Sequence, residues 1–127
     1  VGMRNDANGW NLRNPWFKGA CKPIGITTMH KMEGAHLYMF EGFMDWLSYV
    51  LLYGEPDCTA IILNSTVFLT MIMDILQGSD GVHAYVDNDP AGDRAIEDMM
   101  DNQVDVIDHR DEYAEHNDLN ELVQSTF

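Results

Sequence analysis

The chain has 127 residues and a mass of 14.4 kDa, which is enough for one domain and leaves little room for a second. Its composition, 46% hydrophobic and 10% aromatic, excludes a disordered chain, and no apolar stretch is long enough for a membrane-spanning helix. The net charge is −14: residues 1–40 hold five Lys and Arg against two Asp and Glu, whereas residues 41–127 hold two against nineteen. Because an acidic surface repels a phosphate backbone, divalent cations or another domain must supply positive charge if the protein handles nucleic acid. The simpler alternative is an acidic, soluble surface without such a role.

The predicted elements begin with a lead-in over residues 1–35. Its Asn8-Gly9 pair predicts a β-hairpin, which an irregular or extended stretch follows. From residue 36 onward, short apolar runs alternate with helix-like stretches. We predict strands at 36–40, 60–63, 82–86 and 104–107, and helices at 43–53, 67–76, 90–102 and 118–124. This alternation predicts an α/β fold, with about four mainly parallel strands and helices on both faces, preceded by the N-terminal β-hairpin lead-in.

Acidic residues stand at the ends of three of the four predicted strands. Glu41 follows the first strand, Asp87-Asn88-Asp89 follows the third, and the fourth runs into Asp108, whereas the second ends in Asn64-Ser65. Ligands of parallel α/β sheets bind beyond the carboxyl ends of the strands. Clustered carboxylates repel one another unless a cation lies among them, and hard oxygen ligands without thiolates suit Mg²⁺ or Mn²⁺.

Some of the acidic residues also fit plain helix-capping or helix-dipole roles: Asp45, Asp89, Asp118 and Glu121. The last two have the spacing of a capping box. Glu41 and Asp87 have no such explanation, because each comes after an apolar strand where a cap gains nothing. Other chemistries lack their residues: the chain has neither a G-x-G-x-x-G nor a P-loop motif, and no lysine after Lys31 for a phosphoaspartate receiver.

Two cysteines, Cys21 and Cys58, are too few for a disulfide scaffold or for a zinc site built on thiolates. No secretion signal is present at the beginning of the chain, so we expect a cytoplasmic protein with reduced thiols. The first residues do not have the look of a natural start, and we expect the chain to be a piece of a longer protein.

The acidic segments resemble motifs of the Toprim (topoisomerase–primase) domain. Residues 37–45, Leu-Tyr-Met-Phe-Glu-Gly-Phe-Met-Asp, resemble the family's apolar strand–Glu-Gly–aromatic–x–Asp signature. Residues 85–92, Tyr-Val-Asp-Asn-Asp-Pro-Ala-Gly, resemble its Asp-x-Asp motif in the form that DnaG-type primases carry, and residues 118–121 resemble the third acidic motif. Residues 5–19 resemble the segment before Toprim in primase-like proteins of bacterial mobile elements. The resemblance implies a compact Rossmann-like Toprim domain over 36–127, with 1–35 as the tail of a preceding primase-core segment.

The resemblance also implies site residues. Glu41 would act as general base or acid in phosphoryl transfer, and Mg²⁺, with Mn²⁺ as substitute, would be the cofactor. The positions that match the motifs are the metal ligands Asp87, Asp89, Glu41 and Asp45 and the auxiliary acidic residues Asp118 and Glu121. Asn64 and Ser65 lie where the family places a nucleotide-binding loop.

The implied function is Mg²⁺-dependent nucleotidyl transfer by the Toprim domain of a DNA primase-like protein, which makes primers on single-stranded DNA. The implied partners are single-stranded DNA and nucleoside triphosphates, bound through a missing N-terminal region, and a replicative helicase, with no membrane involved. Related proteins commonly have Lys where this chain has Asn117, and few basic residues are present, so we expect the isolated chain to be inactive. Two alternatives remain: a Mg²⁺-dependent nuclease of the overcoming-lysogenization-defect type, and a non-enzymatic Toprim assembly module in recombination or replication.

Overall fold

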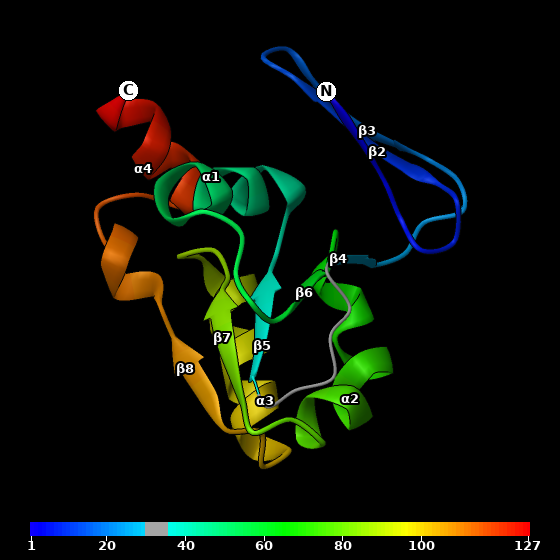
Figure 1. Cartoon of the computed structure of the whole chain (residues 1–127), viewed down its shortest axis with the longest axis vertical. Helices are drawn as coiled ribbons and strands as arrows, with labels where there is room; N and C mark the ends of the chain where they lie inside the picture. The colour runs from blue at the N-terminus through cyan, green and yellow to red at the C-terminus, as the bar shows by residue number, and fades with distance from the viewer. Residues whose placement is uncertain (30–35) are drawn as a thin grey trace.

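The computed structural model describes residues 1–29 and 36–127, and these form two sheets (Figure 1). The smaller sheet is antiparallel with strand order β1-β2-β3: β1 (Gly2–Arg4), β2 (Trp10–Asn14) and β3 (Phe17–Cys21). The larger sheet has five strands in the order β4-β6-β5-β7-β8: β4 (Thr27–Met29), β5 (His36–Phe40), β6 (Thr59–Ile62), β7 (Gly81–Tyr85) and β8 (Val106–Asp108). The helices are α1 (Phe43–Tyr53), α2 (Met73–Gln77), α3 (Pro90–Asp101) and α4 (Leu119–Thr126), with short 3₁₀ turns η1 (Thr66–Phe68), η2 (Thr70–Ile72) and η3 (Arg110–Tyr113).

The larger sheet is parallel except at one edge. Strands β6, β5, β7 and β8 run in the same direction, in the register Phe40↔Ile62, Phe40↔Tyr85 and Ala84↔Asp108. This confirms the predicted α/β fold with about four mainly parallel strands. The fifth strand, β4, pairs antiparallel with β6. It was not predicted, because three residues are too few for a periodic signal.

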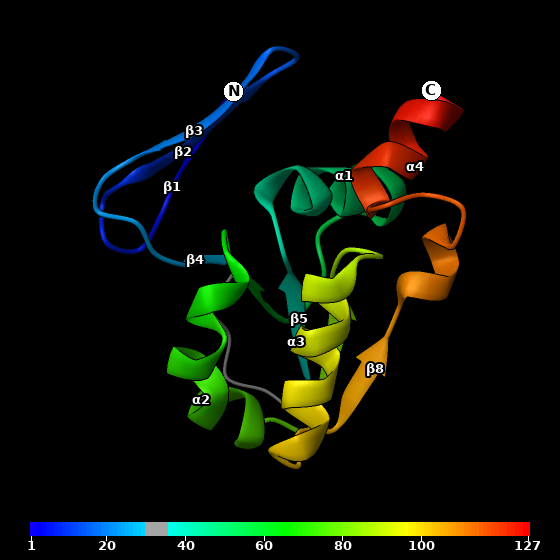
Figure 2. The same ribbon diagram turned by 180° about the vertical axis from the view of Figure 1, so that it is seen from behind.

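Both faces of this sheet are covered by helices, as Figures 1 and 2 show from opposite sides. Successive side chains of a strand point to opposite faces, so one strand supplies two cores. On the face of α2 and α3 the buried residues include Met39, Ile61, Val82, Leu76 and Met99. On the face of α1 and α4 they include Phe40, Ile62, Tyr85, Trp46 and Leu119. Among the described residues, none of the helices has the length and apolar composition to cross a membrane.

The helices around the site begin and end much as predicted. Helix α1 is closed by Gly54, which has φ +79° and donates its N–H to the carbonyl of Val50. Helix α3 begins at Pro90, and α4 begins after Asp118. The helix predicted over 67–76 is instead divided into η1, η2 and α2. Its β-branched residues disfavour a continuous α-helix there.

The last predicted strand is shifted along the chain. Residues 104–107 were expected, but β8 begins at Val106 and includes Asp108. The reason lies at the end of α3, where the N–H of Val104 donates to the carbonyl of Met99 and Gln103 takes a left-handed φ of +63°. Asp108 consequently pairs with Arg110 and not with the other strand-end carboxylates.

The lead-in contains the predicted hairpin and two further strands. Residues 5–9 connect β1 and β2, and the side chain of Asn5 accepts the N–H groups of Ala7 and Gly9. Gly9 is required here, because a Cβ at this position would lie 1.8 Å from the carbonyl oxygen of Pro23. The stretch expected to be irregular or extended includes β3 and β4. The predicted domain boundary at residue 35 lies outside the described residues and stays a prediction.

Hydrogen bonds connect the small sheet to the larger one. The Asp6 carboxylate accepts the N–H of Thr28 at 2.8 Å and its hydroxyl at 2.6 Å. The Asn64 side chain, at the end of β6, donates to the carbonyl of Gly25 at 2.8 Å and to the Thr27 hydroxyl at 3.1 Å. The Asp6 bonds connect the turn between β1 and β2 to β4, and the Asn64 bonds hold the segment before β4 at the end of β6. The small sheet thus lies over the carboxyl ends of the parallel strands, where the two sheets line one cavity.

Candidate metal centre

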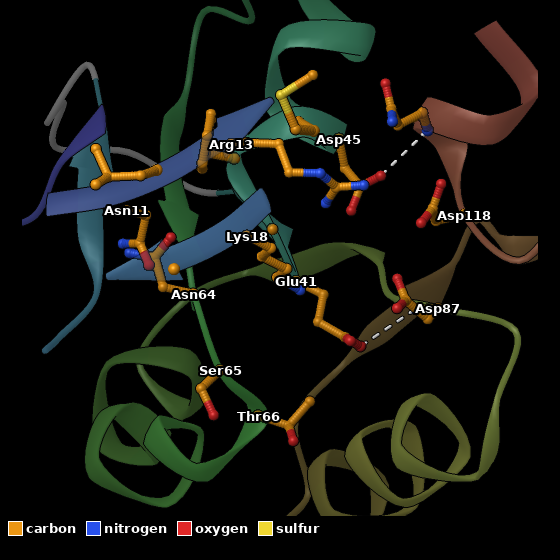
Figure 3. Close-up of a pocket in the computed structure, with 16 residues that line it drawn as sticks. Asn11, Arg13, Lys18, Glu41, Asp45, Asn64, Ser65, Thr66, Asp87 and Asp118 are labelled. Atoms are coloured by element: carbon orange, nitrogen blue, oxygen red, sulfur yellow. Dashed lines mark hydrogen bonds between the residues drawn. The ribbon is translucent and has the colours of Figure 1, made fainter. Parts of the chain in front are cut away.

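Glu41 and Asp87, the two strand-end carboxylates that have no capping role, lie side by side. Strands β5 and β7 are neighbours, and Glu41 and Asp87 follow them in the chain. The N–H of Glu41 donates to the carbonyl of Tyr85 at 3.2 Å. The N–H of Asp87 donates to Oε1 of Glu41, also at 3.2 Å (Figure 3). The pairing of β5 with β7 therefore places one carboxylate against the backbone of the other.

Around this pair the fold gathers two acidic triads. Glu41, Asp87 and Asp89 form the first triad, and Asp45, Asp87 and Asp118 form the second; within each, one oxygen per residue lies within 4.8 Å of the others. Asp87 belongs to both triads. Oxygens that share a Mg²⁺ at about 2.1 Å each lie up to about 4.2 Å apart, so small side-chain movements would bring either triad around a cation. The donors are all carboxylate oxygens, which is the ligand set that suits Mg²⁺ or Mn²⁺.

The electrostatics of the triads disfavour full ionisation. Asp45 is 5% exposed, and its burial, with the charges of Asp118 and Glu41, raises its pKa to about 7, although Asn120 donates an N–H to it at 3.1 Å. Burial and the adjacent Glu41 charge raise the pKa of Asp87 to about 8. A divalent cation would remove this repulsion, so the site is built for a positive ligand.

Asp89 and Asp118 are helix caps as well as triad members. Asp89 Oδ1 accepts the N–H of Gly92, and Asp118 Oδ1 accepts the N–H of Glu121, each at 2.8 Å. Each carboxylate has a second oxygen, so a cap and a metal ligand are compatible roles. Glu121 belongs to neither triad; its Oε2 accepts the N–H of Asn117 at 2.6 Å.

Asn88 connects the Asp87–Asp89 segment to the loop that precedes Asp118, although this role was not predicted from the sequence. Its N–H donates to the carbonyl of Asn117 at 2.7 Å, and its side chain donates to the carbonyls of Tyr113 and His116 at 3.0 and 2.8 Å. These bonds position the loop that ends at Asp118. The only sequence signal was the place of this amide between the two aspartates of the Asp-x-Asp motif.

Gly92 fixes the distance between α3 and the end of β7. A Cβ at this position would lie 1.9 Å from the carbonyl oxygen of Asp87 and 2.9 Å from its carbonyl carbon. Because backbone cannot yield as a flexible side chain does, any larger residue must displace either α3 or Asp87.

Asn64 and Ser65 lie beside the triads and line the same cavity. Asn64 takes a left-handed φ of +63°, and its Oδ1 is buried without a hydrogen-bond partner among the described residues. The Ser65 hydroxyl accepts the N–H of Val67 and so caps η1. Their predicted contact with a nucleotide stays a prediction.

A cavity of about 280 Å³ separates the larger sheet from the small one. Its floor carries Glu41, Asp45, Asp87 and Asp118, whereas Asn11, Arg13 and Lys18 of the small sheet line the opposite side (Figure 3). The two cations were not predicted as site residues, since nothing in the sequence shows that β2 and β3 fold over the strand ends.

A Toprim-like family model matches residues 38–123, so the chain belongs to the Toprim-like family. The match includes the strand-end acidic residues and both triads. Comparison with curated proteins and with solved structures gives no match. Membership in this family makes the chain a metal-dependent nucleic-acid enzyme or a module of replication or recombination, and the acidic triads are positioned for a metal ion.

Proposed function

We propose that the chain is the catalytic Toprim domain of a DNA primase-like protein, which joins nucleotides into primers on single-stranded DNA. One observation carries the proposal: Asp87 belongs to two acidic triads and donates its N–H to Glu41. A phosphoryl-transfer site needs both a cation-binding cluster and a proton acceptor beside it. The aspartates, together with one oxygen of Glu41, take the first role, and Glu41 also takes the second.

In this mechanism the hydroxyl oxygen of a growing primer attacks the α-phosphorus of a nucleoside triphosphate. A phosphorus–oxygen bond forms, the bond to the β-phosphate breaks, and pyrophosphate leaves. Glu41 takes the hydroxyl proton; its Oε1 accepts the N–H of Asp87, which leaves Oε2 as the proton acceptor. Mg²⁺ bound by Asp87, Asp89, Glu41 and Asp45 would supply neutralisation of the phosphate oxygens.

The proposed partners are single-stranded DNA and nucleoside triphosphates, with a replicative helicase as a further partner, in the cytoplasm of a cell that carries a mobile element. The scarcity of cations supports a need for additional basic surface: residues 41–127 hold only Arg94 and Arg110, and Arg110 is engaged by Asp93 and Asp108. We therefore propose that a longer version of the chain, with a preceding primase-core segment, is the active form.

The test is primer synthesis from nucleoside triphosphates on single-stranded DNA, with Mg²⁺ or Mn²⁺, by the chain and by its longer version. Glu41→Gln and Asp87→Asn should each abolish synthesis, whereas Asp80→Asn, an exposed aspartate outside the triads, should not. Normal synthesis by both site variants would refute the assignment.

A nuclease is the second candidate, because two triads that share Asp87 could equally support hydrolysis of a phosphodiester. Metal-dependent nicking of a plasmid, without primer synthesis, would favour it over the primase. If the stability of the chain were unchanged by EDTA and by Asp87→Asn, the chain would instead be an assembly module without catalysis.

A further inference from the structure

Two cations of the small sheet lie opposite the acidic triads. Arg13 of β2 and Lys18 of β3 are directly paired in register, so their side chains are on the same face of the small sheet. Both line the cavity whose floor carries Glu41 and Asp87 (Figure 3). The cavity therefore has one acidic side and one basic side.

The two cations also have no partner among the residues that the structure describes: neither the Arg13 guanidinium nor the Lys18 ammonium forms a hydrogen bond or an ion pair with them. Arg110, by contrast, binds two carboxylates. In a chain of net charge −14, two cations that face a cavity without partners are placed for a ligand that carries its own negative charge.

Asn64 lines the same cavity at the end of β6. Its amide nitrogen donates to the Gly25 carbonyl, in the segment that follows β3, and to the hydroxyl of Thr27 in β4. These bonds attach the segment that follows Arg13 and Lys18 to the end of the parallel sheet.

We propose that Arg13 and Lys18 bind the phosphate groups of the substrate on the side opposite the metal site. This inference rests on the proposed function and deepens it: the small sheet becomes one wall of the active site. A phosphate between the two sides would be neutralised from both, by bound cations on the floor and by charge-assisted hydrogen bonds from Arg13 and Lys18. The phosphates belong either to a nucleoside triphosphate or to a nucleic-acid strand.

The experiment compares two charge-matched double variants of the chain. Arg13→Gln with Lys18→Gln removes the cavity cations. Arg4→Gln with Lys22→Gln removes the same charge from exposed positions of the same segment that do not line this cavity. Binding is measured in Mn²⁺ with two probes, a fluorescent ATP analogue and a fluorescein-labelled oligothymidine, over a series of salt concentrations. Mn²⁺ binding is measured separately by calorimetry without either probe.

The cavity variant should bind at least one probe about tenfold more weakly, whereas the control variant should change by less than about twofold. The probe that is affected identifies the source of the phosphate. The cavity variant should also bind Mn²⁺ itself more tightly than the wild type, because two opposing cations have been removed. That increase would not follow from a merely structural role.

Equal weakening by both double variants would overturn the inference, since it would indicate general attraction to charge. A wild-type chain that binds Mn²⁺ but neither probe would also overturn it, while the metal site and the proposed function remain. A wild-type chain that binds no Mn²⁺ under any of these conditions would count against the proposed function itself.

Discussion

The N–H of Asp87 donates to Oε1 of Glu41 at 3.2 Å, so the backbone geometry of the strand ends brings the two carboxylates together. The bond exists because β5 and β7 are adjacent and parallel, with Phe40 paired with Tyr85. The repulsion between the carboxylates is therefore imposed by the fold. The chain keeps a locally unfavourable charge arrangement at the position where a metal-dependent reaction would use it.

Asp87→Asn should stabilise the metal-free protein and remove its response to metal. In EDTA the free energy of unfolding should rise by about 1–2 kcal/mol, because the variant replaces a half-buried carboxyl group of raised pKa, partly screened by solvent, with a neutral amide. Chemical denaturation with and without Mn²⁺ measures both effects. Asp80→Asn, at an exposed position outside the triads, is the control and should change neither quantity. If Asp87→Asn destabilised the protein in EDTA, the repulsion inferred here would be wrong.

Gly92→Ala should damage the site more than its small change in volume suggests. The new Cβ would lie 1.9 Å from the Asp87 carbonyl oxygen, so α3 or the end of β7 must move. We expect a loss of about 2–4 kcal/mol in the free energy of unfolding and at least tenfold weaker Mn²⁺ binding. Gly78→Ala is the matched control, because its Cβ would meet no atom closer than 3.5 Å. Equal behaviour of the two variants would show that α3 can shift without cost.

Much of the parallel sheet could be predicted because each of its strands but the last has a strong local signal. The run His36–Phe40 is apolar and ends at Glu41, and the α3 start has Asp89 as cap and Pro90 in the first turn. The carboxyl-end rule then brought Glu41 and Asp87 together without any knowledge of strand order. The predicted range of the last strand was wrong because the turn after α3 depends on a hydrogen bond from Val104 to Met99, which no local pattern encodes.

The basic side of the cavity could not be predicted, for a different reason. Arg13 and Lys18 are close to the triads only because the small sheet folds back over the strand ends, which depends on contacts such as that of Asp6 with Thr28. These are contacts between short polar segments, and they leave no periodicity in the sequence. Asn88 was missed because a hydrogen-bonding amide next to two conspicuous aspartates looks like a spacer.

Asn88→Ala should weaken metal binding while the protein stays folded. It removes side-chain bonds to the carbonyls of Tyr113 and His116, and so loosens the loop that carries Asp118. We expect a loss of about 1–2 kcal/mol in the free energy of unfolding, with Mn²⁺ binding at least fivefold weaker. The control is Asn102→Ala, which loses an exposed bond to the carbonyl of Asp98 at the far end of α3. Unchanged Mn²⁺ binding in Asn88→Ala would mean that Asp118 does not contribute to a metal site.

The stability of the metal-free protein should fall as the pH rises from about 4 to about 8. The pKa values of Asp45 and Asp87 are raised to about 7 and about 8 from the ordinary value of 3.8, so in this window the folded protein holds protons that the unfolded chain has released. The free energy of unfolding therefore decreases with pH until both groups are ionised. His83 acts in the opposite sense below its ordinary pKa, because burial and the neighbouring His109 lower its pKa.

Denaturation in EDTA at pH 5, 6, 7 and 8, on the wild type and on Asp87→Asn, measures this dependence. The variant keeps His83, so the difference between the two pH profiles isolates the contribution of Asp87. Metal should reverse the trend, because its binding displaces the protons: Mn²⁺ affinity should increase with pH by up to about tenfold per unit for each proton released. Calorimetry in two buffers of different ionisation enthalpy counts these protons. A Mn²⁺ affinity that did not change between pH 6 and 8 would show that the triads are already ionised, and that neither Asp45 nor Asp87 holds a proton in the metal-free site.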